Sequence, residues 1–302
     1  MIKKITQWKW VARLLVSTLL LSGVAIQASF SQKIPYAGER IILSVDGNEH
    51  SKNDWGATPL SLALFAAYGL QDQVVVYSFS GHTWGSNKVY PGSDAQMRES
   101  AFKGSEQFGF KKTIFVEAVN SPNFAIIEIA EQINKSSNKN PLLILVGGSM
   151  EIIGTALNEA DSTKLAHVRL LAHSSWDGKH AEQPEEWESH KGWTWDKIKE
   201  SFAGKGLKME ILLQEEGEEE FTGLKAPVAQ YAWIKNSPMK DGKPFQKGSW
   251  DWLYSRLEAA KEGDEMNPAD AGLVLYLLTG KLKITPEDIR EVLENPGKLN
   301  FK

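Results

Sequence analysis

The stretch that decides the fold is RIILSVDGNEHSKNDWGATPLSLALFAAYGL, residues 40–70. It begins with an apolar, β-branched run at residues 41–45, which is typical of a strand buried on both faces of a sheet. Residues 58–68 are helical in character, and Thr58-Pro59 suits an N-cap followed by a first helical position. Ligands bind at the carboxyl ends of strands in an open parallel sheet, so the turn between these elements is the first candidate site. Among its polar residues are Asp46, Asn48, Glu49, His50, Asn53 and Asp54.

So many oxygen donors in one turn favour a bound divalent cation, because the oxygens otherwise repel one another. Calcium (Ca2+) fits best, since it accepts many oxygen ligands in loose geometry. An EF-hand is excluded: counting from Asp46, Ser51 occupies the glycine position and Ala57 the glutamate position. Zinc fits poorly, since the chain has no cysteine and no H-E-x-x-H. The alternative without a metal is an Asx-type turn formed by Asp46 and Asn48, with Asn53 or Asp54 capping the helix.

The strand, acidic turn and helix together resemble the inosine-uridine nucleoside hydrolases, which open with a strand, then D-x-D-x-x-x-D-D, then a helix. In that family the aspartates hold a calcium ion and one of them activates the attacking water. By position Asp46 matches the first aspartate, Asn48 the second and Asp54 the last, in a loop one residue longer. Asn53 falls where the family places its general base. An amide can ligate calcium but cannot take a proton, so other residues are candidates for the base: Asp46, Glu49 or His50.

The whole composition is that of an ordinary soluble protein. Of 302 residues, 24% are charged and 42% are hydrophobic, with a formal net charge of −4. No basic stripe stands out, which argues against a nucleic acid polymer as partner. The expected partner is a small-molecule glycoside or nucleoside, and association into a homo-oligomer is left open.

The first 30 residues match a signal peptide. Basic residues precede an apolar run at residues 14–26, and small residues follow it. That run is shorter than the ~20 residues of a membrane-spanning helix, so we expect no membrane association after signal cleavage. The absence of cysteine excludes a lipoprotein. We therefore expect a periplasmic or secreted protein with one nucleoside hydrolase-like domain at residues 31–302.

Strand-like and helix-like segments alternate along this domain, which predicts an α/β fold with a doubly wound, mostly parallel sheet and helices on both faces. After residues 41–45, the predicted strands are residues 74–79, 113–119, 142–146, 168–172 and 208–214. After residues 58–68, the predicted helices are residues 94–108, 123–135, 150–159, 194–202, 250–261 and 268–279.

Polar and aromatic residues follow the later strands, where a doubly wound fold keeps its site. Four tryptophans crowd one polar stretch, and we expect some of these rings to cover a ligand; they are Trp176, Trp187, Trp193 and Trp195. The candidates for substrate binding are Trp84, Asn120, Glu151, Trp176 and His180. The candidates for catalysis are Asp46, Asn53, His82 and His173.

The resemblance continues beyond the first turn. LLILVGGSMEIIGTAL, residues 142–157, is similar to a family strand and helix in which a backbone carbonyl before the glycines ligates calcium. That carbonyl would belong to Val146. Asn267-Pro-Ala-Asp270 is similar to the family's late histidine-aspartate pair, with Ala269 in place of the histidine that assists the leaving group. The implied metal ligands are therefore Asp46, Asn48, Asp54, Val146 and Asp270. Alternatively, Asp270 is only a first-turn acid that complements the helix dipole.

These observations predict a calcium-dependent hydrolase of a glycosidic bond, similar to a nucleoside N-ribohydrolase or acting on another glycoside. Because Ala269 cannot donate a proton, the donor would be His82, His173 or His180. We expect a leaving group larger or less basic than a purine, such as a second sugar. The alternative is a secreted, catalytically inactive carbohydrate-binding protein of the same fold. A serine hydrolase built on Ser149 is disfavoured, because the glycine two residues later is missing.

Overall fold

The computed structural model describes residues 35–47, 52–83, 90–172, 175–179, 192–212, 224–239, 245–297 and 299, with only the backbone of residues 175 and 176. Residues 33–302 form one compact unit. The predicted signal peptide lies outside the described residues. Within the described part of the chain, no helix combines the length and the apolar character that crossing a membrane requires.

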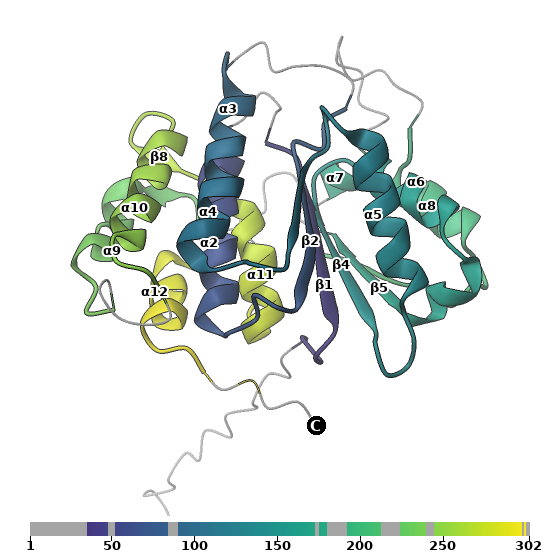
Figure 1. The fold of residues 1–302 in the computed structure, drawn as a ribbon. Helices are drawn as coiled ribbons and strands as arrows, with labels where there is room; N and C mark the ends of the chain where they lie inside the picture. The colour runs from purple at the N-terminus through teal and green to yellow at the C-terminus, as the bar shows by residue number, and fades with distance from the viewer. Residues whose placement is uncertain are drawn as a thin grey trace, which may run out of the picture. The chain divides into compact units, whose positions relative to one another are not determined.

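The centre of this unit is a sheet of six parallel strands in the order β3-β2-β1-β4-β5-β6 (Figure 1). The sheet grows outward in both directions from β1 and β4, so the topological switch point lies between these two strands. The doubly wound α/β fold is therefore confirmed. The strands are β1 (Arg40–Val45), β2 (Val74–Phe79), β3 (Ile114–Glu117), β4 (Leu142–Gly147), β5 (Val168–Ala172) and β6 (Lys208–Ile211).

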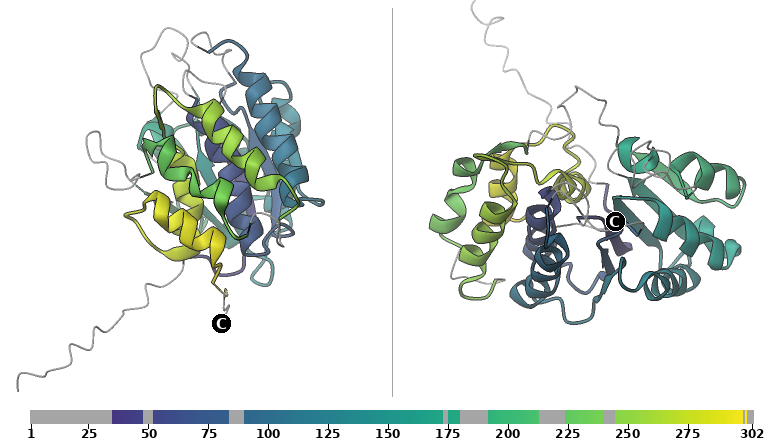
Figure 2. Two further views of the ribbon diagram at one scale, coloured as in Figure 1. Left: turned by 90° about the vertical axis from the view of Figure 1, so that its left-hand side faces the viewer. Right: turned by 90° about the horizontal axis from the view of Figure 1, so that it is seen from above.

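Side chains alternate between two cores because successive residues of a strand point to opposite faces. In β1, Ile41 and Leu43 join one core and Ile42 joins the other. Figures 1 and 2 show the two helical layers on either side of the sheet. The first layer holds α2 (Asn53–Ala67), α3 (Ser93–Arg98), the π-helix η1 (Glu99–Lys103), α4 (Gly104–Phe108), α9 (Trp233–Asn236), α10 (Ser249–Ala260), α11 (Ala269–Thr279) and α12 (Pro286–Glu294). The second holds α5 (Pro122–Asn134), α6 (Glu151–Glu159), the 3-10 helix η2 (Ser162–His167) and α8 (Trp195–Ser201).

The remaining described elements are short. They are α7 (Ser175–Lys179), the 3-10 helix η4 (Val228–Tyr231) and an antiparallel ribbon of β7 (Ala226–Pro227) and β8 (Glu265–Met266). Both α7 and the β7-β8 ribbon matter for the site, because they follow β5 and precede α11 respectively.

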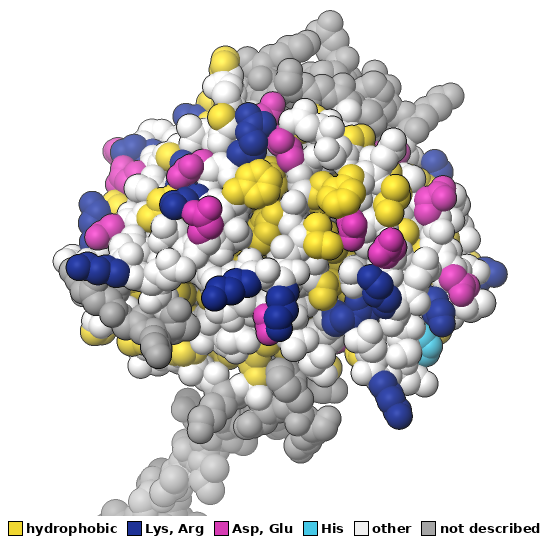
Figure 3. Space-filling model, viewed as in Figure 1, with side chains coloured by type: hydrophobic (Ala, Val, Ile, Leu, Met, Phe, Trp, Pro, Cys, Tyr) yellow, Lys and Arg dark blue, Asp and Glu magenta, His cyan; other side chains and the backbone are white. Residues whose placement is uncertain are grey.

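Hydrophobic side chains gather near the middle of the face seen in Figure 3. Three of the large exposed hydrophobic residues lie on η1 and α5: Phe102, Phe124 and Ile127. The outermost strand, β3, has no described partner on its far side. An ion pair of 2.6 Å joins Arg98 of α3 to Glu117 of β3. Charged groups of this kind protect a sheet edge from pairing with other chains.

The prediction for the first helix is wrong at its start. Helix α2 begins at Asn53, so Thr58 and Pro59 lie inside it rather than at its N-terminus. A proline inside a helix lacks the N–H that would bond the carbonyl four residues earlier, here that of Trp55. The hydroxyl of Ser100 donates to this carbonyl at 2.6 Å, and Nε of Arg256 donates to the same hydroxyl at 3.0 Å. A tertiary contact thus replaces the bond that Pro59 cannot make.

Ser100→Ala is expected to lower the free energy of unfolding by about 1–3 kcal/mol, because it leaves the buried Trp55 carbonyl without this donor. The control is Ser105→Ala, which removes an exposed hydroxyl that donates to the carbonyl of Phe102 at 2.7 Å. In a Pro59→Ala background the restored N–H replaces the lost donor, so Ser100→Ala should cost less. Urea unfolding of the double-mutant cycle measures this coupling. An equal cost in both backgrounds would contradict the role assigned to Ser100.

Candidate metal centre

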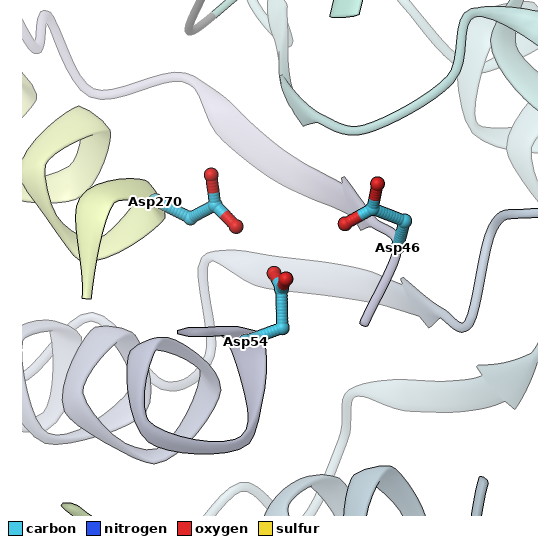
Figure 4. Close-up of side chains that lie close together, drawn as sticks. All are labelled: Asp46, Asp54 and Asp270. Atoms are coloured by element: carbon cyan, nitrogen blue, oxygen red, sulfur yellow. The ribbon is translucent and has the colours of Figure 1, made fainter. Parts of the chain in front are cut away.

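Three carboxylates meet beside the switch point of the sheet. Asp46 directly follows β1, Asp54 is the second residue of α2, and Asp270 is the second residue of α11. Each offers a ligand oxygen, and these oxygens all lie within 4.8 Å of one another. Figure 4 shows the three side chains reaching toward a common space from three separate elements. This set, called the acid cluster below, could hold a metal ion.

Two glycines at the end of β4 permit this convergence. The amide of Asp46 donates to the carbonyl of Gly147 at 3.3 Å, which continues the pairing of β1 with β4. A Cβ added at Gly148 would lie 2.7 Å from the backbone nitrogen of Asp46. One added at Gly147 would lie 2.9 Å from the carboxyl carbon of Asp270. Only glycine lets the β4 backbone lie this close to two of the acids.

Burial and mutual repulsion dominate the electrostatics of the acid cluster. Asp46 and Asp54 are 6% and 2% exposed. Burial raises the pKa of both carboxyls well above the usual range, and the charges of neighbouring carboxylates add to the rise. Burial likewise raises the pKa of Asp270 to about 7. Oδ1 of Asp54 is buried and has no hydrogen-bond partner among the described residues. Hard oxygen donors crowded in this way fit a divalent cation such as calcium.

Two helix N-termini also face the acid cluster. The N-caps of α2 and α11 are Lys52 and Pro268, and neither makes a side-chain capping hydrogen bond. The alternative in which Asn53 or Asp54 caps α2 is therefore wrong. Asp54 and Asp270 each stand in the first turn, where the helix dipole stabilises negative charge. Asp270 thus both complements the dipole of α11 and belongs to the acid cluster.

A fourth acid was missed by the sequence analysis. Asp177 of α7 is 5% exposed, and its charge contributes to the raised pKa of Asp46, Asp54 and Asp270. Its oxygens are not part of the set that lies within 4.8 Å. In the sequence it was only one polar residue after a strand, and the five-residue helix that carries it gives no periodic signal. It therefore adds a carboxylate close to the acid cluster without completing it.

His82 lies in the turn after β2, which runs directly along the end of β1. In this turn the amide of Ser80 donates to the carbonyl of Asp46 at 2.8 Å, and the amide of Gly81 donates to that of Val45 at 3.0 Å. Ser80 adopts a φ of 55°, which is rare for a residue other than glycine. The side chain of His82 is fully buried.

The hydroxyl of Ser149 donates to the carbonyl of Gly81 at 3.0 Å. This bond occupies the hydroxyl that a serine hydrolase would need as its nucleophile.

Glu151 and two of the tryptophans have structural contacts. Glu151 accepts a 2.7 Å hydrogen bond from the backbone amide of Trp193. The ring of Trp193 lies on Gly154 of α6 and stacks on Phe202 with centroids 6.0 Å apart. Trp195 packs against the same core. Trp193 and Trp195 therefore have structural roles, and the expectation that some of the four rings cover a ligand stays a prediction for Trp176 and Trp187, whose side chains lie outside the described residues.

The other candidates are distributed as follows. Val146 is fully buried one residue before the end of β4, and Asn53 is partly buried at the start of α2. Asn120 is exposed after β3, two strands away from β1, so the structure does not bring it to the acid cluster. The side chain of Trp176 lies outside the described residues, as do the following residues: Asn48, Glu49, His50, Trp84, His173, His180 and Trp187.

The chain is similar to a curated protein and to a solved structure. No family model matches the chain. It is 26% identical over 261 residues to "Uncharacterized protein P22" of Formosa agariphila, an alignment that covers 80% of this chain and 84% of that protein. Among solved structures it is similar to an inosine-guanosine nucleoside hydrolase, with a TM-score of 0.46, 13% sequence identity and 80% of each chain covered.

Proposed function

We propose that this protein is a calcium-dependent hydrolase of a glycosidic bond, similar to a nucleoside N-ribohydrolase or acting on another glycoside. The observation that carries the proposal is the acid cluster: three carboxylates within 4.8 Å at the switch point of a doubly wound sheet. Asp46, Asp54 and Asp270 would hold the cation, and the sequence resemblance adds Asn48 and the carbonyl of Val146. Calcium, when bound, supplies a positive charge that orients sugar hydroxyls and an attacking water.

The chain's own residues would supply proton transfer. Asp46 and Asp177 are buried carboxylates, and we propose that one of them accepts a proton from a water at the acid cluster. Ala269 is 5% exposed at the start of α11 and cannot donate a proton to the leaving group. His82 is the described histidine beside the end of β1, and we assign it the donor role. His173 and His180 are further proposed donors.

Hydrolysis of a substrate panel tests the proposal. Nucleosides and oligosaccharides are incubated with the protein and calcium, and released reducing sugar is measured. Asp46→Asn should lower the rate at least about 100-fold, because the variant loses both a ligand and a proton acceptor. Asp196→Asn, an exposed acid of α8, is the matched control and should retain the wild-type rate. If the wild-type protein releases no sugar from any substrate, hydrolysis is contradicted.

The second candidate is an inactive carbohydrate-binding protein of the same fold. Ala269 and Asn53 favour it, because both positions lack an ionisable group that the resembling family uses. Binding of oligosaccharides without release of reducing sugar would support this function instead. For either function we propose export to the periplasm or beyond, which N-terminal sequencing of the mature protein from cell fractions would test.

A further inference from the structure

A polar pocket of about 270 Å³ lies next to the two helix starts that carry Asp54 and Asp270. We call it the Asn53–Asn267 pocket, and its lining residues are Asn53, Lys225, Ala260, Glu262, Glu265 and Asn267. Asn53 directly precedes Asp54 in α2, and Asn267 stands three residues before Asp270. Two of the lining residues of the pocket are therefore neighbours in the chain of two acids of the acid cluster.

Backbone hydrogen bonds fix the conformation of the turn that carries Glu262 and Glu265. The amide of Glu262 donates to the carbonyl of Glu265 at 2.7 Å, and the amide of Glu265 donates back at 3.2 Å. Gly263, with a φ of +62°, permits the tight turn between them. Glu265 is the first residue of β8, and β8 pairs with β7, the strand that begins directly after Lys225. These contacts set the spacing of both glutamates before any ligand enters.

The chemistry of this lining suits a molecule with many hydroxyl groups. Two amides and two carboxylates offer donors and acceptors, and no aromatic side chain is among the described lining residues. Oδ1 of Asn267 is buried without a hydrogen-bond partner among the described residues. The hydroxyl of Tyr90, which is not one of the lining residues, donates to Glu262 at 2.6 Å. The lining carries two carboxylates, Glu262 and Glu265, and one ammonium group, Lys225, so binding of an anion such as a phosphate, a sulfate or a uronate is disfavoured.

We propose that the Asn53–Asn267 pocket binds a neutral sugar as the leaving group of the substrate, so that the bond cleaved at the acid cluster joins two sugar units. This inference rests on the proposed function and narrows its substrate class. A nucleobase would need a flat apolar wall to stack on, and the described lining provides none. A sugar instead satisfies the amides and carboxylates with its hydroxyls, and its ring fits a pocket of this size.

Calorimetric titration tests the inference. A panel of neutral disaccharides, together with inosine and uridine, is titrated into the full chain with calcium present. The wild-type protein should bind at least one disaccharide tenfold more tightly than either nucleoside. Asn267→Ala and Glu262→Gln should each weaken that binding at least tenfold. The matched control is Asn138→Ala, which changes a residue lining a separate cavity of about 220 Å³ at the amino ends of β4, β5 and β6 and should bind like the wild type.

Three results would overturn the inference: tighter binding of a nucleoside than of every disaccharide, no binding of any disaccharide, or wild-type binding by Asn267→Ala. Melting curves with calcium and with chelator are measured for each variant, so that a misfolded variant is recognised, and Glu262→Gln provides a milder substitution. Loss of sugar binding with an unchanged calcium effect supports the role of the pocket. A wild-type protein that binds disaccharides without a calcium effect or turnover contradicts the proposed function and not the sugar preference.

Discussion

Asp54→Asn is expected to raise the melting temperature of the calcium-free protein at pH 8 and to abolish its stabilisation by calcium. Without a cation, burial and the neighbouring carboxyls make ionisation of Asp54 unfavourable, so an amide of the same shape removes that cost. With calcium, the same substitution removes an anionic ligand. For the wild-type protein, a hundredfold excess of calcium over its Kd stabilises the fold by about 2.7 kcal/mol. In a domain of this size that corresponds to a Tm rise of roughly 5 °C.

The pH dependence gives an independent signature. The folded pKa of Asp270 is about 7, against 3.8 for the ordinary carboxyl. Between these values the folded state binds more protons than the unfolded state, so the calcium-free protein loses stability as pH rises from about 4 to about 7. Saturating calcium should weaken or reverse this slope, because cation binding displaces protons from the carboxyls.

Scanning calorimetry from pH 4 to pH 8, with calcium or with a chelator, measures both effects. Asp196→Asn serves as control, because this acid is exposed on α8 and its removal should alter neither the slope nor the calcium response. A wild-type protein whose Tm ignores calcium, together with an Asp54→Asn variant less stable than the wild type, would contradict a cation site at the acid cluster.

Gly148→Ala is expected to lower the free energy of unfolding by about 1–3 kcal/mol and to weaken calcium binding at least tenfold. The added Cβ would lie 2.7 Å from the backbone nitrogen of Asp46 and 3.1 Å from its Cβ. Neither atom is at the far end of a flexible side chain, so neither can move away easily. Either β4 or the residue after β1 must then shift. Because Asp46 is a proposed ligand, its displacement should cost affinity as well as stability.

Urea unfolding in the presence of chelator and calcium titration of the folded protein separate the two effects. Gly297→Ala is the matched control, since an added Cβ there would approach no atom closer than 3.5 Å. If Gly148→Ala matches this control in both measurements, the glycine does not set the position of Asp46.

The sequence predicts elements well where the signal is local. The apolar runs at residues 74–79 and 168–172 coincide with β2 and β5. The start of α2 could not be read in this way, because Pro59 is typical of a first helical turn. Its tolerance inside the helix depends on Ser100, a partner 45 residues away from Trp55 in the chain. Such a tertiary substitution has no local signature.

One helix was missed although its signal was present. Helix α12 begins with a capping box in which Thr285 and Asp288 bond each other's backbone, with Pro286 at the first position. For Trp193 the local signal was misleading, because its polar neighbours suggested a contact with a ligand. In the structure its ring packs on Gly154 of α6, which lies far from it in the sequence. Asp177 likewise acquires its place only through the fold, since nothing in its own segment points to the other acids.

The acid cluster has a consequence for biosynthesis. Asp46 directly follows the first described strand and Asp54 belongs to the first described helix, whereas Asp270 belongs to the last helix but one. All six strands of the sheet precede α11 in the chain, so they leave the ribosome before the third carboxylate exists. A cation that needs all three acids therefore cannot be fully bound until α11 has been made. A chain that ends before α11 would have the strands but no complete site.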